Sequence, residues 1–519
     1  MNKYLYSALL ALVSLIVSQT GAGAANPPTV KIRVAQYAKS LEFVMPEGGQ
    51  WSSGQNKGTL ARGKTFRLEG HMTAPALRKY HLMTGSAAIN KPEILAEVEN
   101  RFKQYKTHRF VAGHKPEPGY PDNRIVFVGV GIFDDETKAK EAQDKLAAEA
   151  ISSWIFHENI KPAQGTVAVY LGKKKLFASK EGIELIPATS TTLKKAEFAR
   201  GFSWHGFENR HFSGKLFIGW GFENSLDCVE QTDLEKLIIG IVPSEISAKA
   251  PDSALQAQAV AARGEMLSKR GTRHFNEGFD FCSEQHCQVY KGLQSVDQKI
   301  AGCIKNTRGL ILENHEGGIL DAVYSANCGG HSSANHQIWV SNPDKHLQGV
   351  CDLKTPVKMD LTDHKQAEEF IRKPSEAWCS MTGVEGADKF RWEKTLNEAD
   401  WKKVEEAAGV GRISSISEFV REVSGRIISI KISGSAGEKT VLRELAIRKL
   451  FGMLRSSNFI VEWQHDKEGW IVGASFIGAG WGHGVGMCQT GAQSMGKAGY
   501  SFDKILLHYF PGAQLKKLY

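Results

Sequence analysis

Beyond its first residues, the 519-residue sequence has no apolar run long enough to span a bilayer, and it has no low-complexity tract or short-period repeat. It also has no basic patch interleaved with aromatic residues, which argues against a nucleic-acid partner. The glycine-rich stretch 480–487 is not followed by Lys-Ser or Lys-Thr, so it lacks the pattern of a phosphate-binding loop. What remains is a globular composition, 42% hydrophobic and 23% charged, over a length that predicts two or three domains.

Cysteine is scarce. Eight cysteines in a chain of this length are too few for a scaffold built on disulfides. In an oxidising compartment their even number permits pairing, and Cys351 with Cys379 is one candidate pair because both lie in the same region. The formal net charge of +9 suits anionic cell-wall polymers or lipid surfaces as partners. A charge of this size is also common in proteins without such partners.

The N-terminus, MNKYLYSALLALVSLIVSQTGAGAAN, has Lys3, an apolar run over about residues 5–17 and then small residues that fit a signal-peptidase site. We expect residues 1–24 to be a secretory signal peptide, because the apolar run is too short for a bilayer span. An uncleaved anchor is the alternative. The mature protein is then expected to be exported, in the periplasm or on the cell-wall side of the cytoplasmic membrane.

Residues 25–200 are expected to form a separate N-terminal region. Its patterns predict a strand over 125–132, a helix that starts at Asp-Glu-Thr, and a strand at GTVAVYLG. This order resembles the SPOR domain, a small module that binds the glycan strands of peptidoglycan, over about residues 100–175. An unrelated small α+β domain is the alternative.

Two helices are predicted around the sequence GIVPSEISAKAPDSALQAQAVAAR. A capping box that starts at Thr232 precedes apolar residues at helical spacing, and Pro243 is expected to end this first helix. The second helix is expected to begin at Pro251 and to run towards Lys269, with alanines that let another backbone approach closely. Glu245 is therefore predicted in the loop between two packed helices.

The segments VPSEI, ALQAQAVAAR, CSEQHCQVYKG, YSANCGGHSS, FRWEKTL, SGRI and GWGHGVGMCQTGAQSMGKAGYSFDKILLHYFPGAQL occur in this order. They resemble the stage II sporulation protein D / amidase-enhancer family over about residues 212–519. We therefore expect a catalytic domain over 210–519, with the charged stretch 341–389 as an insertion. The expected fold class is multidomain α+β: a catalytic domain with a helix pair that carries the acid and a mixed β-sheet, plus a small α+β N-terminal module.

The resemblance implies a lytic transglycosylase that cleaves the MurNAc–GlcNAc bond of peptide-free glycan strands and leaves anhydro-MurNAc ends. By the family pattern, Glu245 is the catalytic acid. One carboxylate is enough, because the sugar's own hydroxyl closes the ring and the ionised glutamate then accepts its proton; most glycosidases use two carboxylates. Such an acid needs a pKa raised by apolar surroundings. The alternative roles of Glu245 are capping the second helix and pairing with Arg263.

Other residues are candidate substrate contacts, with a place in the core as the alternative for each. The segment YSANCGGHSS offers short polar side chains beside an aromatic ring, which suits a sugar site. The alternate glycines of GWGHGVGM permit tight turns and present His483 as a hydrogen-bond donor. The predicted substrate-binding residues are Arg263, Tyr290, Tyr324, Ser325, Asn327, His331 and His483.

His274, Cys282 and Cys287 are candidate zinc ligands. Some members of the family carry zinc near this point, coordinated by one histidine and two cysteines. The five-residue step between the cysteines is not the usual spacing of a metal knuckle, and a disulfide is the alternative in an oxidising compartment. We therefore expect no cofactor, with a structural zinc as the alternative.

Three classes of function fit these patterns. The first is the enzyme, and the second is a non-catalytic amidase enhancer that binds peptidoglycan and stimulates an N-acetylmuramoyl-L-alanine amidase. A wall-anchoring protein is a third. Glu245 in an apolar setting favours the enzyme, because a pure enhancer does not need it. The expected partners are glycan strands and, in the second class, the amidase, with no nucleic acid.

Overall fold

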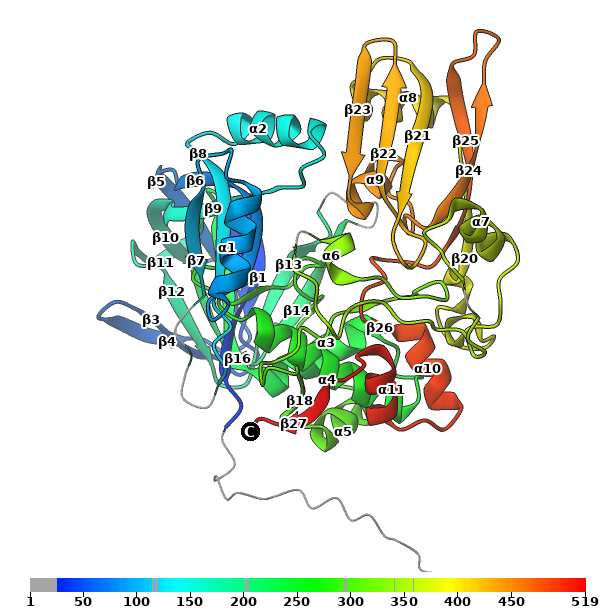
Figure 1. The fold of residues 1–519 in the computed structure, drawn as a ribbon. Coiled ribbons are helices and arrows are strands. Elements are labelled where there is room, and N and C mark those ends of the chain that lie inside the picture. Colours follow the sequence, from blue (N-terminus) through cyan, green and yellow to red (C-terminus); the bar gives the residue numbers. More distant parts are fainter. Residues whose placement is uncertain are drawn as a thin grey trace, which may run out of the picture.

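The computed structural model describes residues 26–113, 116, 120–200, 205–293, 296–339, 341–357 and 359–519 (Figure 1). The expected signal peptide, residues 1–24, lies outside the described residues. None of the described helices is long and apolar enough to cross a membrane. The chain contains helices and many strands, and the strands form several sheets. This confirms the expected multidomain α+β class.

Two large sheets in the first half of the chain share one apolar core. The first contains, in order, β17 (Phe281–Cys282), β1 (Thr29–Ala38), β16 (Leu226–Asp233), β15 (Lys215–Trp220), β12 (Ile183–Pro187), β3 (Gly49–Ser53) and β4 (Asn56–Leu60). The second contains β11 (Lys174–Ser179), β10 (Gln164–Leu171), β5 (Thr65–Ala74), β2 (Ser40–Val44), β13 (Thr191–Phe198) and β14 (Gly206–Phe212).

The strand pairing in the first sheet contradicts the expected domain boundary near residues 200–210. Strand β1 pairs antiparallel with β16, so that Thr29 lies opposite Asp233. It also pairs in parallel with β17, where Arg33 lies opposite Cys282. The N-terminal strands therefore complete the sheet that leads into the predicted catalytic region, and the two regions are not separate domains.

A small α+β module is inserted between β5 and β10 (Figure 1). Its sheet has the order β7 (His108–Ala112), β8 (Ile125–Phe133), β6 (Leu77–Ala88), β9 (Trp154–Lys161), and its helices are α1 (Pro92–Arg101) and α2 (Glu136–Ala148). The module has its own apolar core. Its ends meet where Ala74 pairs with Gln164.

These bounds correct the expected module at about 100–175. The predicted strand over 125–132 and the helix after it are present as β8 and α2. The stretch GTVAVYLG, however, forms β10 of the second large sheet, and the strand that follows α2 in the module is β9. The chain order β-α-β-β-α-β over 77–161 is the split βαβ arrangement.

A helical layer follows β16. It consists of α3 (Leu234–Glu245), α4 (Asp252–Lys269), α5 (Gln298–Asn306), α10 (Gln489–Lys497) and α11 (Phe502–Tyr509). Helix α4 lies at the centre, packed by the other four, and most of its residues are buried. The predicted span of α4 up to Lys269 is confirmed. The predicted cap at Thr232 is wrong, because Thr232 pairs with Val30 in the sheet and the Asp233 side chain accepts from Lys236 N–H instead.

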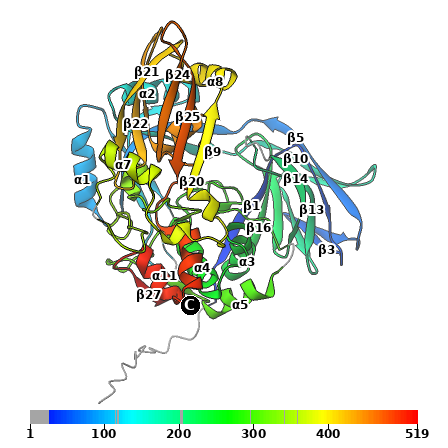
Figure 2. The same ribbon diagram turned by 90° about the vertical axis from the view of Figure 1, so that its right-hand side faces the viewer.

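Residues 391–479 form a further unit with a core of their own, above the helical layer (Figures 1 and 2). Its two sheets have the orders β20 (Arg391–Leu396), β25 (Ile471–Ala479), β24 (Phe459–His465) and β21 (Ile413–Arg421), β22 (Ile427–Gly434), β23 (Gly437–Leu442), with helices α8 (Glu398–Ala408) and α9 (Glu444–Leu450). The predicted domain 210–519 therefore contains two cores rather than one.

Several short elements complete the fold. Strands β18 (Leu310–Glu313) and β27 (Gln514–Lys517) pair antiparallel, and β19 (Tyr324–Ser325) and β26 (Met487–Cys488) pair in parallel. The remaining elements are α6 (Asn335–Ile338), α7 (His364–Arg372), η1 (Trp378–Ser380) and η2 (Ala387–Lys389). The β19–β26 pair brings the segments YSANCGGHSS and GWGHGVGM together.

Candidate active site around Glu245

Glu245 is the last residue of α3, not a loop residue, because the helix continues through Pro243. A proline lacks its own N–H, but the residues after it can still donate to carbonyls one turn back. Ile246 N–H donates in this way to Val242 O (3.0 Å). The carboxyl group is therefore fixed to the end of a buried helix rather than to a loop.

The surroundings of Glu245 favour its neutral form. Its side chain is half-buried. Loss of solvation raises the pKa of Glu245 to about 7, and the nearby charge of Glu265 acts in the same direction. Hydrogen bonds from Val289 N–H (3.2 Å to Oε1) and from the Gln489 amide oppose this rise. Near neutral pH, a substantial fraction of Glu245 can donate a proton.

Buried glutamines hold the backbone of the acid in place. Gln489 Nε2, at the start of α10, donates to Glu245 O (3.1 Å) and to Gln258 Oε1 (3.2 Å). Gln258 lies on α4 and is fully buried. Neither glutamine is among the residues predicted from the sequence, although both lie in segments that carry the family resemblance. Their burial on two helices was the missing information.

Tyr324 belongs to a second network beside the acid. Its hydroxyl donates to Gln288 Oε1 (2.9 Å), and Gln288 Nε2 donates to Glu265 Oε2 (3.2 Å). The other oxygen of Glu265 accepts from Lys269 Nζ (2.7 Å). Glu265 is the charged neighbour of Glu245, but both of its oxygens are engaged, so it is poorly placed to act as a second catalytic carboxylate.

The segment GWGHGVGM forms the predicted tight turns. Gly480, Gly482, Gly484 and Gly486 all have φ between 73° and 94°, a region that favours glycine. His483 Nδ1 accepts from Val485 N–H (3.0 Å). Burial and nearby cations, Arg426 first among them, lower the pKa of His483 to about 3. The imidazole is therefore neutral and can donate only from Nε2.

Two predicted substrate contacts lie in the core instead. Arg263 is fully buried and donates from Nε to Glu235 Oε1 (2.8 Å). Tyr290 is also buried, and its hydroxyl donates to Glu230 Oε2 (2.8 Å). Neither side chain is accessible to a glycan, so the prediction of substrate contact is corrected for both. The proposed pair of Arg263 with Glu245 is replaced by a pair with Glu235.

The candidate substrate contacts in the segment YSANCGGHSS also differ in their surroundings. Asn327 is fully buried and donates from Nδ2 to the carbonyls of Cys379 and Gly386 (both 3.0 Å), so its role is structural. His331 is half-buried and donates from Nδ1 to Ser332 O (2.7 Å). Ser325 Oγ is buried without a hydrogen-bond partner among the described residues, so it remains a candidate donor to a ligand.

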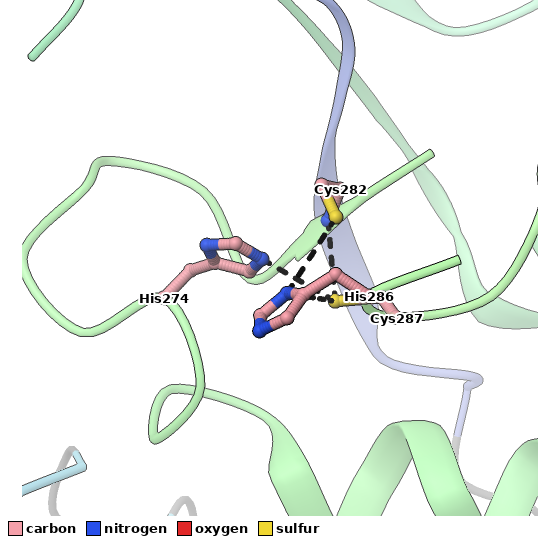
Figure 3. A group of neighbouring side chains, drawn as sticks. All are labelled: His274, Cys282, His286 and Cys287. Carbon is pink, nitrogen blue, oxygen red and sulfur yellow. Dashed lines mark hydrogen bonds between the residues drawn. The ribbon is translucent and has the colours of Figure 1, made fainter. Parts of the chain in front are cut away.

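The predicted metal ligands converge near the end of the first large sheet, with His286 as a fourth group (Figure 3). His274 Nε2 lies 3.3 Å from Cys287 Sγ, and His286 Nδ1 lies 3.8 Å from the sulfurs of both Cys282 and Cys287. The four ligand atoms lie within 4.8 Å of one another. Hydrogen bonds from Cys287 and the histidines lower the pKa of the Cys282 thiol.

All eight cysteines are free thiols in the structure. The alternative disulfide between Cys282 and Cys287 is therefore not formed, and the candidate pair of Cys351 with Cys379 is wrong. Cys379 Sγ lies 3.6 Å from Cys328 Sγ instead. A cavity of about 270 Å³ next to the histidine–cysteine group is lined by parts of β1, β13 and residues 282–286, and Glu245 does not line it.

Two family models match parts of the chain. A family model described as stage II sporulation protein matches residues 222–313, which include Glu245 and the histidine–cysteine group. A second, described as a domain of unknown function, matches residues 333–486. This second match contains the expected insertion 341–389 together with the β20–β25 unit.

Curated relatives cover similar lengths of the chain. Over 299 residues it is 28% identical to the amidase enhancer of Bacillus subtilis, a match that covers 53% of this chain and 40% of that protein. Over 305 residues it is 27% identical to the stage II sporulation protein D of Bacillus subtilis, covering 56% of this chain and 76% of that protein. The protein of that name from Bacillus amyloliquefaciens is 26% identical over 312 residues, with 57% and 78% covered. The chain thus matches less than half of the amidase enhancer.

Proposed function

Because the chain belongs to the stage II sporulation protein D / amidase-enhancer family, we propose that it is a lytic transglycosylase of peptidoglycan, with Glu245 as its acid–base residue. The observation that carries the proposal is the half-buried carboxyl group of Glu245, whose pKa burial raises to about 7. The relatives support a role at the cell wall, and we propose an exported location to match.

The proposed reaction needs one carboxyl group in two protonation states. Protonated Glu245 donates its proton to the glycosidic oxygen as the bond to the anomeric carbon breaks. A hydroxyl of the same sugar then attacks that carbon, and its proton returns to Glu245, which restores the acid. No water is consumed, so the product ends in anhydro-MurNAc. The engagement of both oxygens of Glu265 supports a mechanism with one carboxylate.

The test uses the full chain and peptide-free glycan strands, with products weighed by mass spectrometry. We expect wild-type products that are lighter by one water than hydrolysis products. Glu245→Gln should reduce the rate by about 10²–10⁴-fold, as is typical for loss of a general acid. Glu230→Gln is the matched control, since burial also raises the pKa of Glu230 to about 7 but this side chain is inaccessible. Reducing ends on all products, or wild-type rates in Glu245→Gln, would refute the proposal.

A second candidate function is stimulation of an N-acetylmuramoyl-L-alanine amidase, which the likeness to the amidase enhancer favours. Adding the protein to an amidase digest of peptidoglycan separates the two. Stimulation that survives in Glu245→Gln would assign a role that does not depend on cleavage. Equal digestion with and without the protein would eliminate the enhancer role.

We also propose that His274, Cys282, His286 and Cys287 hold a structural zinc ion. The donor set fits, because two thiolates and two imidazoles form a complete tetrahedral set without an open position. Glu277 Oε1 lies 3.1 Å from the other ring nitrogen of His274, as the orienting partner of a ligand histidine does. The zinc would supply stability between β1 and the loop after α4, and no step of the reaction passes through it.

A further inference from the structure

A second cluster of metal-ligand side chains lies where β19, β26 and η1 meet. Cys328 follows β19, Asp352 lies within the expected insertion, Cys379 lies in η1, and Cys488 ends β26. All four side chains are almost completely buried, and their ligand atoms lie within 4.8 Å of one another. These residues are up to 160 positions apart, so only the fold brings them together.

The separations suit a shared metal ion. Cys328 Sγ lies 3.6 Å from Cys379 Sγ and 3.3 Å from Asp352 Oδ2. Zinc binds sulfur at about 2.3 Å, so a tetrahedral site places two sulfurs about 3.8 Å apart and a sulfur and an oxygen slightly closer. A disulfide requires about 2.05 Å between the sulfurs. The observed 3.6 Å therefore lies close to the zinc distance and far from the disulfide distance.

Surrounding groups orient the ligands. Cys488 Sγ accepts from the N–H groups of Cys328 (3.2 Å) and Gly491 (3.4 Å), which stabilise a thiolate. Asp352 Oδ2 accepts from Cys379 N–H (3.2 Å), while Oδ1 accepts from the Tyr509 hydroxyl (2.8 Å). Such outer contacts are typical of metal sites.

A glycine keeps this space open. A Cβ on Gly491 would lie 2.0 Å from the Tyr509 hydroxyl and 3.0 Å from Asp352 Oδ2, so any other residue would displace the hydroxyl that donates to Asp352 and would crowd the carboxylate. The first turn of α10 is thus shaped around Asp352 rather than filled with an apolar side chain.

A buried carboxylate needs a compensating charge. Asp352 is fully buried, and its close partners besides the cysteines are the Tyr509 hydroxyl and His508 Nε2, 3.5 Å from Oδ1. Neither carries a permanent positive charge. A divalent cation at the centre of the cluster would supply it.

We propose that Cys328, Asp352, Cys379 and Cys488 bind a structural zinc ion. Three thiols lose their protons to solvent on binding, and thiolate ligands select zinc over magnesium or calcium. The resulting charge of minus two equals that of a zinc site with four cysteines. Four protein ligands leave no open position, so the ion does not act on substrate. It ties residues 351–379 to the start of α10, where Gln489 contacts Glu245.

The test measures zinc per chain in the full protein, purified without chelators. Cys282→Ser/Cys287→Ser removes the first group, and we expect one zinc per chain to remain in this variant. Adding Cys379→Ser should remove it, whereas adding Cys303→Ser, at a buried cysteine outside both groups, should not. Absence of zinc from the Cys282→Ser/Cys287→Ser protein, iron in its place, or retention after Cys379→Ser would overturn the proposal.

Two measurements keep the test decisive if Cys379→Ser fails to fold. Cobalt added to metal-free Cys282→Ser/Cys287→Ser protein should give the thiolate charge-transfer and tetrahedral d–d bands of a sulfur-rich site, at one equivalent, and added zinc should abolish them. Mass spectrometry of the denatured, unreduced protein should find every thiol free. A disulfide among Cys328, Cys379 and Cys488, or no cobalt bands, would refute the zinc site.

Discussion

Replacing Glu245 by glutamine should stabilise the protein in alkaline solution while it slows the proposed cleavage. The carboxyl group has an ordinary pKa of 4.5, and burial raises the pKa of Glu245 to about 7 in the folded protein. Folding therefore favours the neutral form. The stability that this form contributes is fully present below pH 4.5 and is lost as the pH rises through about 7.

The magnitude follows from that difference. One pKa unit corresponds to 1.36 kcal/mol, so the difference between the two pKa values corresponds to about 3 kcal/mol of destabilisation above pH 8. This figure is an upper bound, because the side chain is only partly buried and solvent screens its charge. Glutamine is never charged, so it does not carry this cost. It also keeps a carbonyl oxygen that can accept from Val289 N–H, the bond that Oε1 accepts at 3.2 Å.

Urea unfolding of wild type and Glu245→Gln at a series of pH values between 4 and 9 provides the assay. The two curves should coincide near pH 4 and diverge progressively, with the glutamine variant more stable by about 1–3 kcal/mol at pH 8. Burial also raises the pKa of Glu230 to about 7, but wild type and Glu245→Gln both contain Glu230, so its contribution cancels in the comparison. A variant that is equally or less stable at pH 8 would show that Glu245 is not desolvated and would refute the reasoning.

Three further predictions concern the rate, the core and the module. Cleavage should fall about tenfold per pH unit above the pKa of Glu245, because only the protonated acid donates; a flat profile between pH 7 and 9 would contradict this. Arg263→Ala should destabilise the protein by about 3–5 kcal/mol in urea unfolding, since it removes the cation that pairs with Glu235. The double variant Arg263→Met/Glu235→Gln, which removes both charges, should recover most of the lost stability. Replacing residues 77–161 by a two-residue turn should leave the rest of the protein folded, because Ala74 and Gln164 are already paired. Binding to peptide-free wall material should decrease in this variant. Unchanged binding would contradict a glycan-binding role of the module.

Local patterns predicted local features well. The extent of α4, the turns at the alternate glycines, and the strand and helix at β8 and α2 all depend on neighbouring residues, and all are present. The end of α3 was predicted less well. Proline disturbs only the turn before it, so Pro243 did not stop the helix before Glu245.

Predicted roles of single side chains depended on information that the sequence does not contain. Arg263 and Tyr290 have residue types that suit a sugar site, but each pairs with a glutamate in the core. Gln258 and Gln489 come from distant segments, and their contact with each other and with Glu245 exists only in the folded chain.

The sequence by itself determined the family motifs, Glu245 as the candidate acid and the amphipathic helix that carries it, because these depend on residue type and spacing. The tertiary structure alone decided the pairing of β1 with β16, the raised pKa of Glu245 and the meeting of Cys328, Asp352, Cys379 and Cys488. Burial and proximity between distant segments result from packing of the whole chain, and no local pattern encodes them.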